Sequence, residues 1–152
     1  MITLKEITSY DMLDECVGLK IKEEQQLYSN AYSLAEAWLQ QSIKEVILSP
    51  FCIYKDGIMV GFVMLIHDEA EKGLGIYRFM IDEKYQGKGY GKKAMKVVLE
   101  YIYNNPIFEG YSIGLDVHRD NAVAIKLYED LGFLPTGEVD ENGEMEMYLE
   151  RK

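Results

Sequence analysis

The sequence predicts an α/β (α+β) fold in which a mixed, mostly antiparallel central sheet carries helices on both faces. Strand and helix patterns follow one another in the order β-α-α-β-β-β-α-β-α-β-β. The strands before the glycine-rich turn near residue 89 read as hairpins, and only one strand–helix–strand crossover follows them. The 152 residues contain no linker, repeat or low-complexity tract. We therefore expect residues 1–152 to form a single domain.

The individual elements are predicted from the spacing of apolar residues. Alternation, or a run of β-branched and aromatic residues, predicts strands at residues 2–8, 51–55, 58–67, 73–82, 111–118, 133–139 and 144–150. Apolar residues at helical spacing predict helices at residues 9–26, 33–48, 90–103 and 121–131.

Turn and cap residues set the boundaries of these elements. Residues 33–36, Ser-Leu-Ala-Glu, fit a capping box that begins the second helix, and Pro50 stops that helix. Asp56-Gly57 is a strong signal for a tight hairpin. Asn104-Asn105-Pro106 closes the third helix, and Gly132 is the C-terminal cap of the fourth.

The composition excludes several classes of protein. The formal net charge of -10 repels nucleic acid and anionic membranes and attracts cations. No apolar run is long enough to span a bilayer, and the first residues lack the pattern of a signal peptide, so we expect a cytoplasmic protein. Cys16 and Cys52 sit among apolar neighbours and read as core residues. The cysteines and histidines have no metal-ligand spacing, so no metal is expected.

The most informative segment is Gln86-Gly87-Lys88-Gly89-Tyr90-Gly91, which joins a strand to the start of a helix. Gly89 is not a Ser, Thr or Asp cap, so the first N–H groups of the helix are left for another acceptor. Glycines allow close backbone approach and positive φ, and the helix dipole favours an anion. Lys88, Lys92 and Lys93 make this stretch locally basic in an acidic protein. A phosphate or pyrophosphate is the expected occupant.

Three other interpretations of this loop were weighed. A glycine turn with no ligand fits the spacing equally well. Residues 89–94 also match the dinucleotide fingerprint G-x-G-x-x-A, with Glu109 near the position of the ribose-binding acid. That fingerprint belongs in a parallel array, which the hairpins here disfavour. A nucleoside-triphosphate P-loop fails, because Lys92 is followed by Lys93 rather than Ser or Thr.

Two sequence blocks together resemble the GNAT superfamily of N-acetyltransferases. The family's phosphate loop, [Q/R]-x-x-G-x-[G/A], is matched by Gln86, Gly89 and Gly91. A second family block, N-x-x-A-x-x-L-Y-x-x-x-G-F, is matched by Asn121, Ala124, Leu127, Tyr128, Gly132 and Phe133. The order of elements is also that of the family. More narrowly, residues 30–37, 85–93 and 137–144 resemble bacterial spermine/spermidine (diamine) N-acetyltransferases.

This resemblance implies a function and a set of site residues. The activity would be transfer of an acetyl group from acetyl-CoA to a primary amine such as spermidine or spermine. Backbone groups of Phe79, Met80 and Ile81 would bind the pantetheine arm. The loop would hold the pyrophosphate through Gln86, Gly87, Lys88, Gly89, Tyr90, Gly91 and Lys92. Asn121 would lie near the thioester, and Tyr128 would be the general acid. Their plainer interpretations are a helix N-cap for Asn121 and a core aromatic for Tyr128.

The sequence departs from the family pattern at one position. Some polyamine acetyltransferases carry an acidic residue two positions before the first pantetheine-contacting residue, where this chain has Tyr77, followed by Arg78. The general base is therefore unassigned. Replacement candidates are the carboxylates Glu24, Glu69, Glu71 and Asp116. His67 and His118 are also candidates, because histidine titrates near neutrality. Other acceptors remain open (an aminoglycoside, an amino-acid derivative or a protein N-terminus), as does a non-catalytic acetyl-CoA-binding module. A homodimer is common among relatives.

Overall fold

The computed structural model describes residues 1–22 and 28–151. The strands are β1 (Ile2–Lys5), β2 (Ile47–Lys55), β3 (Ile58–Asp68), β4 (Gly73–Ile81), β5 (Ser112–His118), β6 (Phe133–Val139) and β7 (Glu144–Leu149). The α-helices are α1 (Tyr10–Gly18), α2 (Asn30–Ile43), α3 (Tyr90–Asn104) and α4 (Ala122–Asp130). Short 3-10 helices are η1 (Glu83–Tyr85) and η2 (Pro106–Phe108).

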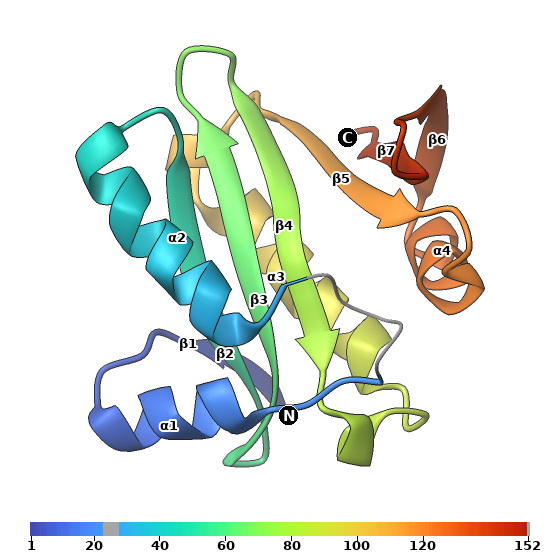
Figure 1. Cartoon of the computed structure of the whole chain (residues 1–152). Helices are drawn as coiled ribbons and strands as arrows, with labels where there is room; N and C mark the ends of the chain where they lie inside the picture. The colour runs from blue at the N-terminus through green and yellow to red at the C-terminus, as the bar shows by residue number, and fades with distance from the viewer. Residues whose placement is uncertain (23–27, 152) are drawn as a thin grey trace.

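All seven strands form one sheet in the order β1-β2-β3-β4-β5-β7-β6. Every neighbouring pair is antiparallel except β4 and β5, which are parallel and are joined through α3. Figure 1 shows β5 leaning away from β4 and carrying the β6–β7 hairpin and α4 with it. The predicted mixed, mostly antiparallel sheet is confirmed.

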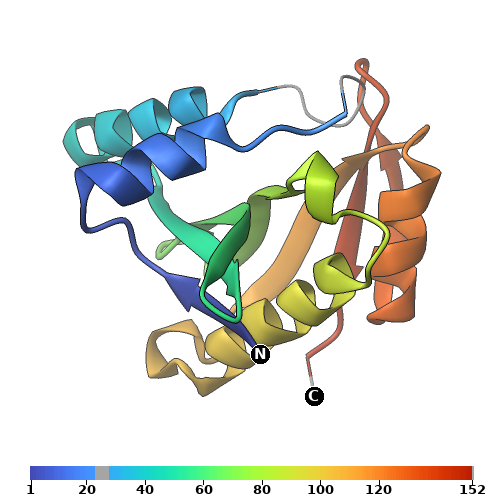
Figure 2. The same ribbon diagram turned by 90° about the horizontal axis from the view of Figure 1, so that it is seen from below.

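Helices cover both faces of the sheet, as predicted (Figure 2). On one face α1 and α2 pack over a cluster that includes Cys16, Phe62 and Met80. On the other face α3 and α4 pack over a larger cluster that includes Val98 and Tyr128. This separation matters for the site, because the residues discussed below fall on one face or the other.

The first strand and helix are shorter than predicted. The strand ends at Lys5 rather than residue 8, and α1 ends at Gly18 rather than residue 26. Ser9 caps α1 by accepting a hydrogen bond from the Met12 N–H at 3.1 Å. Beyond Gly18 the chain becomes extended, because the Lys20 N–H donates to Asp82 at 2.9 Å. A tertiary bond thus overrides the helical pattern, and residues 23–26 of the predicted helix lie outside the described residues.

The predicted capping box of the second helix is wrong. Helix α2 begins three residues earlier, at Asn30, where the hydroxyl of Ser29 accepts from the Tyr32 N–H at 3.1 Å. Ser33 is therefore inside the helix and fully buried. The helix ends at Ile43, and Pro50 lies within β2 rather than stopping a helix. Pro50 is tolerated there because β1 covers only the later part of β2, so that edge needs no donor.

The remaining local signals are confirmed. Asp56 and Gly57 have φ of 51° and 83°, as a tight hairpin turn requires. Gly132 follows α4 with φ of 99°. Cys16 and Cys52 are both fully buried, and the fold brings their thiols into hydrogen-bonding contact. No helix in the described residues is long and apolar enough to cross a bilayer.

Candidate active site

Strand β4 pairs with β3 along its whole length but loses its second partner, β5, halfway. Met64 of β3 pairs with Arg78 and Leu65 pairs with Ile76, so Tyr77 is an extra, bulged residue. Pairing with β5 covers only residues 73–76 of β4. Residues 77–81 therefore continue without β5 beside them, and Figure 1 shows the two strands separating there. Their backbone edge is open to an extended ligand that adds to the sheet as a strand.

The loop after β4 has the backbone geometry that its glycines predicted. Gly87 and Gly89 have φ of 77° and 80°, in the left-handed region. Gly89 is the N-cap of α3 and provides no side-chain cap. The first helical bond runs from the Lys93 N–H to the Gly89 carbonyl at 3.3 Å, which leaves the preceding N–H groups of the first turn facing the loop. These groups fit a phosphate.

Two polar side chains hold this loop in place. Gln86 donates from Nε2 to the carbonyl of Ile81 at 2.8 Å and so closes the loop onto the end of β4. Asp82, only 3% exposed, accepts from the backbone N–H groups of Lys84 and Lys20, both at 2.9 Å. The sequence reasoning missed Asp82. An aspartate directly after a strand and before a turn is a recognisable Asx-turn signal.

The start of α3 lies against β4 and α4. A Cβ built on Gly91 would lie 3.8 Å from Leu127 and 3.9 Å from both Ile81 and Phe79. Lys92 approaches Asp130 of α4 at 3.9 Å. The structure therefore brings the two sequence blocks together with the open edge of β4.

The cationic side chains of the loop are exposed. Lys88 and Lys93 are open to solvent, and Lys92 is about half exposed. Asp130 is shared between Lys92 and Lys126, and its hydrogen bond from Lys126 at 3.0 Å, with Lys92 nearby, holds its pKa below the usual range. Lys88 and Lys93 remain available to an anion bound at the loop.

Asn121 and Tyr128 sit at the start and near the end of α4. Asn121 is the N-cap, accepting from the Ala124 N–H at 3.2 Å. Tyr128 is buried, with its ring 5.8 Å from that of Phe133. Burial raises the pKa of Tyr128, so its hydroxyl keeps its proton at neutral pH. That hydroxyl makes no hydrogen bond with the described part of the chain. A proton donor without a protein acceptor is available to a ligand.

Most of the candidate bases lie away from the open edge of β4. Glu69 and Glu71 are exposed in the β3–β4 turn. From Gly73, next to that turn, to Phe79 the strand rises about 20 Å. His67 faces Phe108 at 5.0 Å on the α3 side, where burial lowers its pKa.

The remaining candidates are near the end of β5 or are not described. Asp116 is on β5, where partial burial and then the charge of Asp140 raise its pKa. His118 accepts from the Asp120 N–H at 3.1 Å. Glu24 lies outside the described residues.

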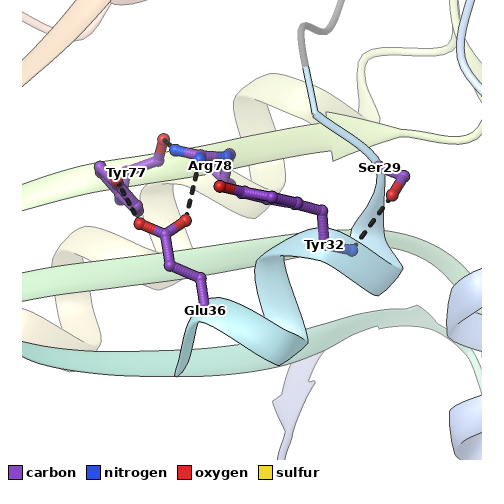
Figure 3. A network of polar contacts seen from close by, with 5 residues as sticks. All are labelled: Ser29, Tyr32, Glu36, Tyr77 and Arg78. Carbon is purple, nitrogen blue, oxygen red and sulfur yellow. Dashed lines mark hydrogen bonds and ion pairs between the residues drawn. The ribbon is translucent and has the colours of Figure 1, made fainter. Parts of the chain in front are cut away.

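A carboxylate that the sequence reasoning assigned to the capping box instead reaches β4 (Figure 3). Glu36 of α2 accepts a hydrogen bond from the hydroxyl of Tyr77 at 2.7 Å and pairs with Arg78 at 3.2 Å. Because Tyr77 is bulged, two consecutive residues of β4 contact the same helix. Burial, and then the bond to Glu36, raise the pKa of Tyr77. The signal for Glu36 was its position three residues after Ser33, which is buried on the same side of the helix.

The dinucleotide interpretation fails on geometry. Glu109 follows η2, at the far end of α3 from the glycine loop. A helix of 15 residues is about 22 Å long, so Glu109 is not beside the loop as a ribose-binding acid must be. A hollow of about 650 Å³ lies elsewhere, lined by residues that include Leu99, Tyr103 and Leu134, and it contains none of the predicted site residues.

Comparison with known proteins identifies the family of this chain. Residues 17–133 match the model of the acetyltransferase (GNAT) family. The spermine/spermidine N(1)-acetyltransferase of Bacillus subtilis (strain 168) is 38% identical over 107 residues, which cover 66% of this chain and 69% of the relative.

Solved structures show the same fold. The aminoglycoside acetyltransferase AAC(6')-Ib, solved in complex with coenzyme A, superposes with a TM-score of 0.75 at 21% identity, over 99% of this chain and 95% of that one. Nourseothricin acetyltransferase gives a TM-score of 0.55 at 23% identity over 67% of this chain, which spans 64% of that protein's length.

Proposed function

Because the chain belongs to the acetyltransferase (GNAT) family and is an acetyl-CoA-dependent N-acetyltransferase, we propose that it acetylates a polyamine such as spermidine or spermine, with Tyr128 as general acid. The observation that carries the chemistry is the open edge of β4, against which the uncapped start of α3 packs at Gly91.

The donor side of the proposed site is built from the loop and β4. The N–H groups at the start of α3, with Lys88 and Lys93 nearby, suit a pyrophosphate. The edge at Phe79, Met80 and Ile81 suits the amide groups of a pantetheine arm, and it extends from the loop toward the bulge. The hydrogen bond from Gln86 to the Ile81 carbonyl fixes the distance between the phosphate loop and the edge of β4. Asn121 begins the helix that carries Tyr128.

The proposed acid has a defined energetic task. A phenol with an ordinary pKa of about 10 is a weaker acid than a thiol of pKa about 8.5, so complete proton transfer to the thiolate is uphill by about 2 kcal/mol. Burial raises this cost, because it raises the pKa of Tyr128. Donation therefore has to accompany cleavage of the C–S bond. The phenolate then recovers a proton from the nitrogen once the C–N bond has formed.

Two observations support a polycationic acceptor. The net charge of -10 attracts polyamines and raises their local concentration. The relative at 38% identity is a spermine/spermidine N(1)-acetyltransferase. The single domain, the homodimer and the cytoplasmic location stay predictions. Light scattering of the purified protein measures its oligomeric state.

The test is an acceptor screen with a matched pair of variants. Release of CoA from acetyl-CoA is followed with spermidine, spermine, an aminoglycoside, amino-acid derivatives and a peptide N-terminus. We expect turnover with the polyamines at the lowest KM. Tyr128→Phe lowers kcat about 100-fold, the scale of general acid catalysis, and leaves the Kd of acetyl-CoA unchanged. Tyr10→Phe, at a position 84% exposed, is the control. No turnover with any polyamine refutes the acceptor, and an unchanged kcat in Tyr128→Phe refutes the acid.

A further inference from the structure

The face of the sheet opposite Tyr128 carries a buried ion pair next to the open edge of β4. Arg78 is 11% exposed and Glu36 is 21% exposed. The guanidinium lies 4.5 Å from the ring of Tyr28 and 4.0 Å from the ring of Tyr77. Glu36 uses one carboxylate oxygen for Arg78 and the other for the Tyr77 hydroxyl. The carboxylate is thus held rigidly, yet part of it remains accessible to solvent.

The same face of α2 carries two further polar groups that lack partners. Asn30 is 5% exposed and donates to the Cys16 carbonyl at 2.9 Å and toward the Met80 sulfur at 3.8 Å. Its carbonyl oxygen and the fully buried hydroxyl of Ser33 have no hydrogen-bond partner among residues 1–22 and 28–151. Each buried, unpaired group costs about 1–3 kcal/mol, so such groups are retained where water or a ligand satisfies them.

These groups form a row that follows β4. Asn30, Ser33 and Glu36 are three residues apart and share one side of the helix. Asn30 contacts Met80 at one end of the row, and Glu36 contacts Tyr77 and Arg78 at the other. The row therefore spans the part of β4 that β5 has left. These polar groups of α2 thus lie along the segment of β4 that an acceptor has to approach.

We propose that Glu36 supplies, from helix α2, the carboxylate that β4 lacks at Tyr77, and that it removes a proton from the acceptor amine through the Tyr77 hydroxyl. This inference rests on the proposed N-acetyl transfer but not on the identity of the amine. Tyr77 is the group that contacts the acceptor, and Glu36 acts through it.

The proton route balances. The ammonium of the acceptor gives one proton to the Tyr77 oxygen while the proton of Tyr77 passes to Glu36, 2.7 Å away. Tyr77 ends unchanged, and Glu36, being partly exposed, releases the proton to water. The neutral nitrogen then forms the C–N bond as the C–S bond breaks. Sulfur takes the proton of Tyr128, and the phenolate takes the second proton from nitrogen.

Arg78 supports this route electrostatically. A lysine-like amine has a pKa of about 10.4, so loss of its proton at pH 7 costs about 4.6 kcal/mol. A cation nearby disfavours the ammonium form and lowers that cost. Among residues 1–22 and 28–151, the charged and titratable groups that contact Glu36 are Tyr77 and Arg78, both from β4 (Figure 3). The ring of Tyr28 lies 4.5 Å from the Arg78 guanidinium, and the ring of Tyr32 stacks on that of Tyr28 at 4.9 Å.

The test separates proton transfer from a structural role. Glu36→Gln and Tyr77→Phe are compared with the wild type by steady-state kinetics from pH 6 to 10, at saturating acetyl-CoA, with an amine that the wild type acetylates. We expect kcat/KM for the amine to fall about 100-fold near pH 7 and its rise with pH to move to higher pH. The Kd of acetyl-CoA stays unchanged. Glu45→Gln, an exposed glutamate just beyond α2, is the matched control.

Loss of Glu36 leaves Arg78 unpaired and destabilises the fold, so a second variant removes that effect. Glu36→Gln/Arg78→Gln restores a neutral pair, and we expect the Tm to recover without the activity. The proposal is overturned if the double variant recovers its activity together with its Tm. It is also overturned if the kcat/KM of the single variants is lower at every pH but its pH dependence is not shifted. If polyamines are not substrates, the series is run with the amine that is acetylated, so the two proposals fail separately. A wild type that acetylates no amine overturns both.

Discussion

Gly61 lies on β3, next to β4, the strand proposed to bind the pantetheine arm. Its replacement tests how tightly β4 is packed against β3. Gly61 of β3 pairs with Ile81 of β4. A Cβ at this position would lie 2.4 Å from the Met80 carbonyl oxygen and 2.9 Å from the Ile81 side chain. The first distance is 0.6 Å below the 3.0 Å that real Cβ atoms keep. The side chain of Ile81 can rotate, but the carbonyl can move only with β4.

Gly61→Ala should therefore be overpacked, at a cost of about 1–3 kcal/mol. Gly73→Ala is the control, because a Cβ there meets nothing nearer than the Ser112 hydroxyl at 3.9 Å. Both changes gain a few tenths of a kcal/mol from the restricted unfolded chain, which cancels in the comparison. We expect Gly61→Ala to be about 2 kcal/mol less stable than Gly73→Ala, a difference in Tm of about 4–8 °C at this chain length.

The assay is thermal and urea unfolding of both variants, together with the KM for acetyl-CoA. Because the Met80 carbonyl has to shift, the KM of Gly61→Ala rises several-fold while that of Gly73→Ala is unchanged. Equal stability of the two variants refutes the packing argument. A large loss of stability with an unchanged KM refutes the placement of the pantetheine arm on this strand.

Two further predictions concern the loop and a buried histidine. Gly89→Ala and Gly137→Ala place alanine at φ of 80° and 93°, so each variant should lose about 1–2 kcal/mol of folding stability. Calorimetry should show weaker acetyl-CoA binding only for Gly89→Ala. Equal affinities of the two variants for acetyl-CoA exclude the loop as the phosphate site. Burial lowers the pKa of His67, so below about pH 6.5 the unfolded chain takes up a proton that the folded chain does not. Urea unfolding should therefore show up to about 1.4 kcal/mol less stability at pH 5.5 than at pH 7.5 because of His67. His67→Phe should remove this contribution of the histidine to the pH dependence. The same pH dependence in His67→Phe contradicts the attribution of the loss to His67.

The parts of the fold predicted best were those set by neighbouring residues. The turn at Asp56-Gly57, the uncapped start of α3 at Gly89 and the cap at Asn121 all depend on residues within one turn of the chain. The end of α1 and the start of α2 were predicted less well. α1 ends where the chain is bound by Asp82, and a serine four residues upstream of the predicted cap begins α2.

The site likewise has a part that local sequence predicted and a part that it did not. Both sequence blocks were recognised, and the fold brings them to the edge of β4. The contact of Glu36 with β4 was not predicted, because the residue also fits a capping box and its partners are 41 and 42 residues away. The choice between these roles depends on which face of α2 is buried, which local pattern does not fix.

The sequence alone therefore determined the order of the elements, the glycine loop at Gly87 and Gly89, and the family resemblance, since positive φ and helix caps are local properties. The tertiary structure decided where β4 separates from β5, because the bulge at Tyr77 depends on register with β3. It also decided which carboxylate faces the open edge. That outcome follows from the partial burial of Arg78, whose charge requires a partner, and from the packing of α2 on the sheet, which brings Glu36 to it.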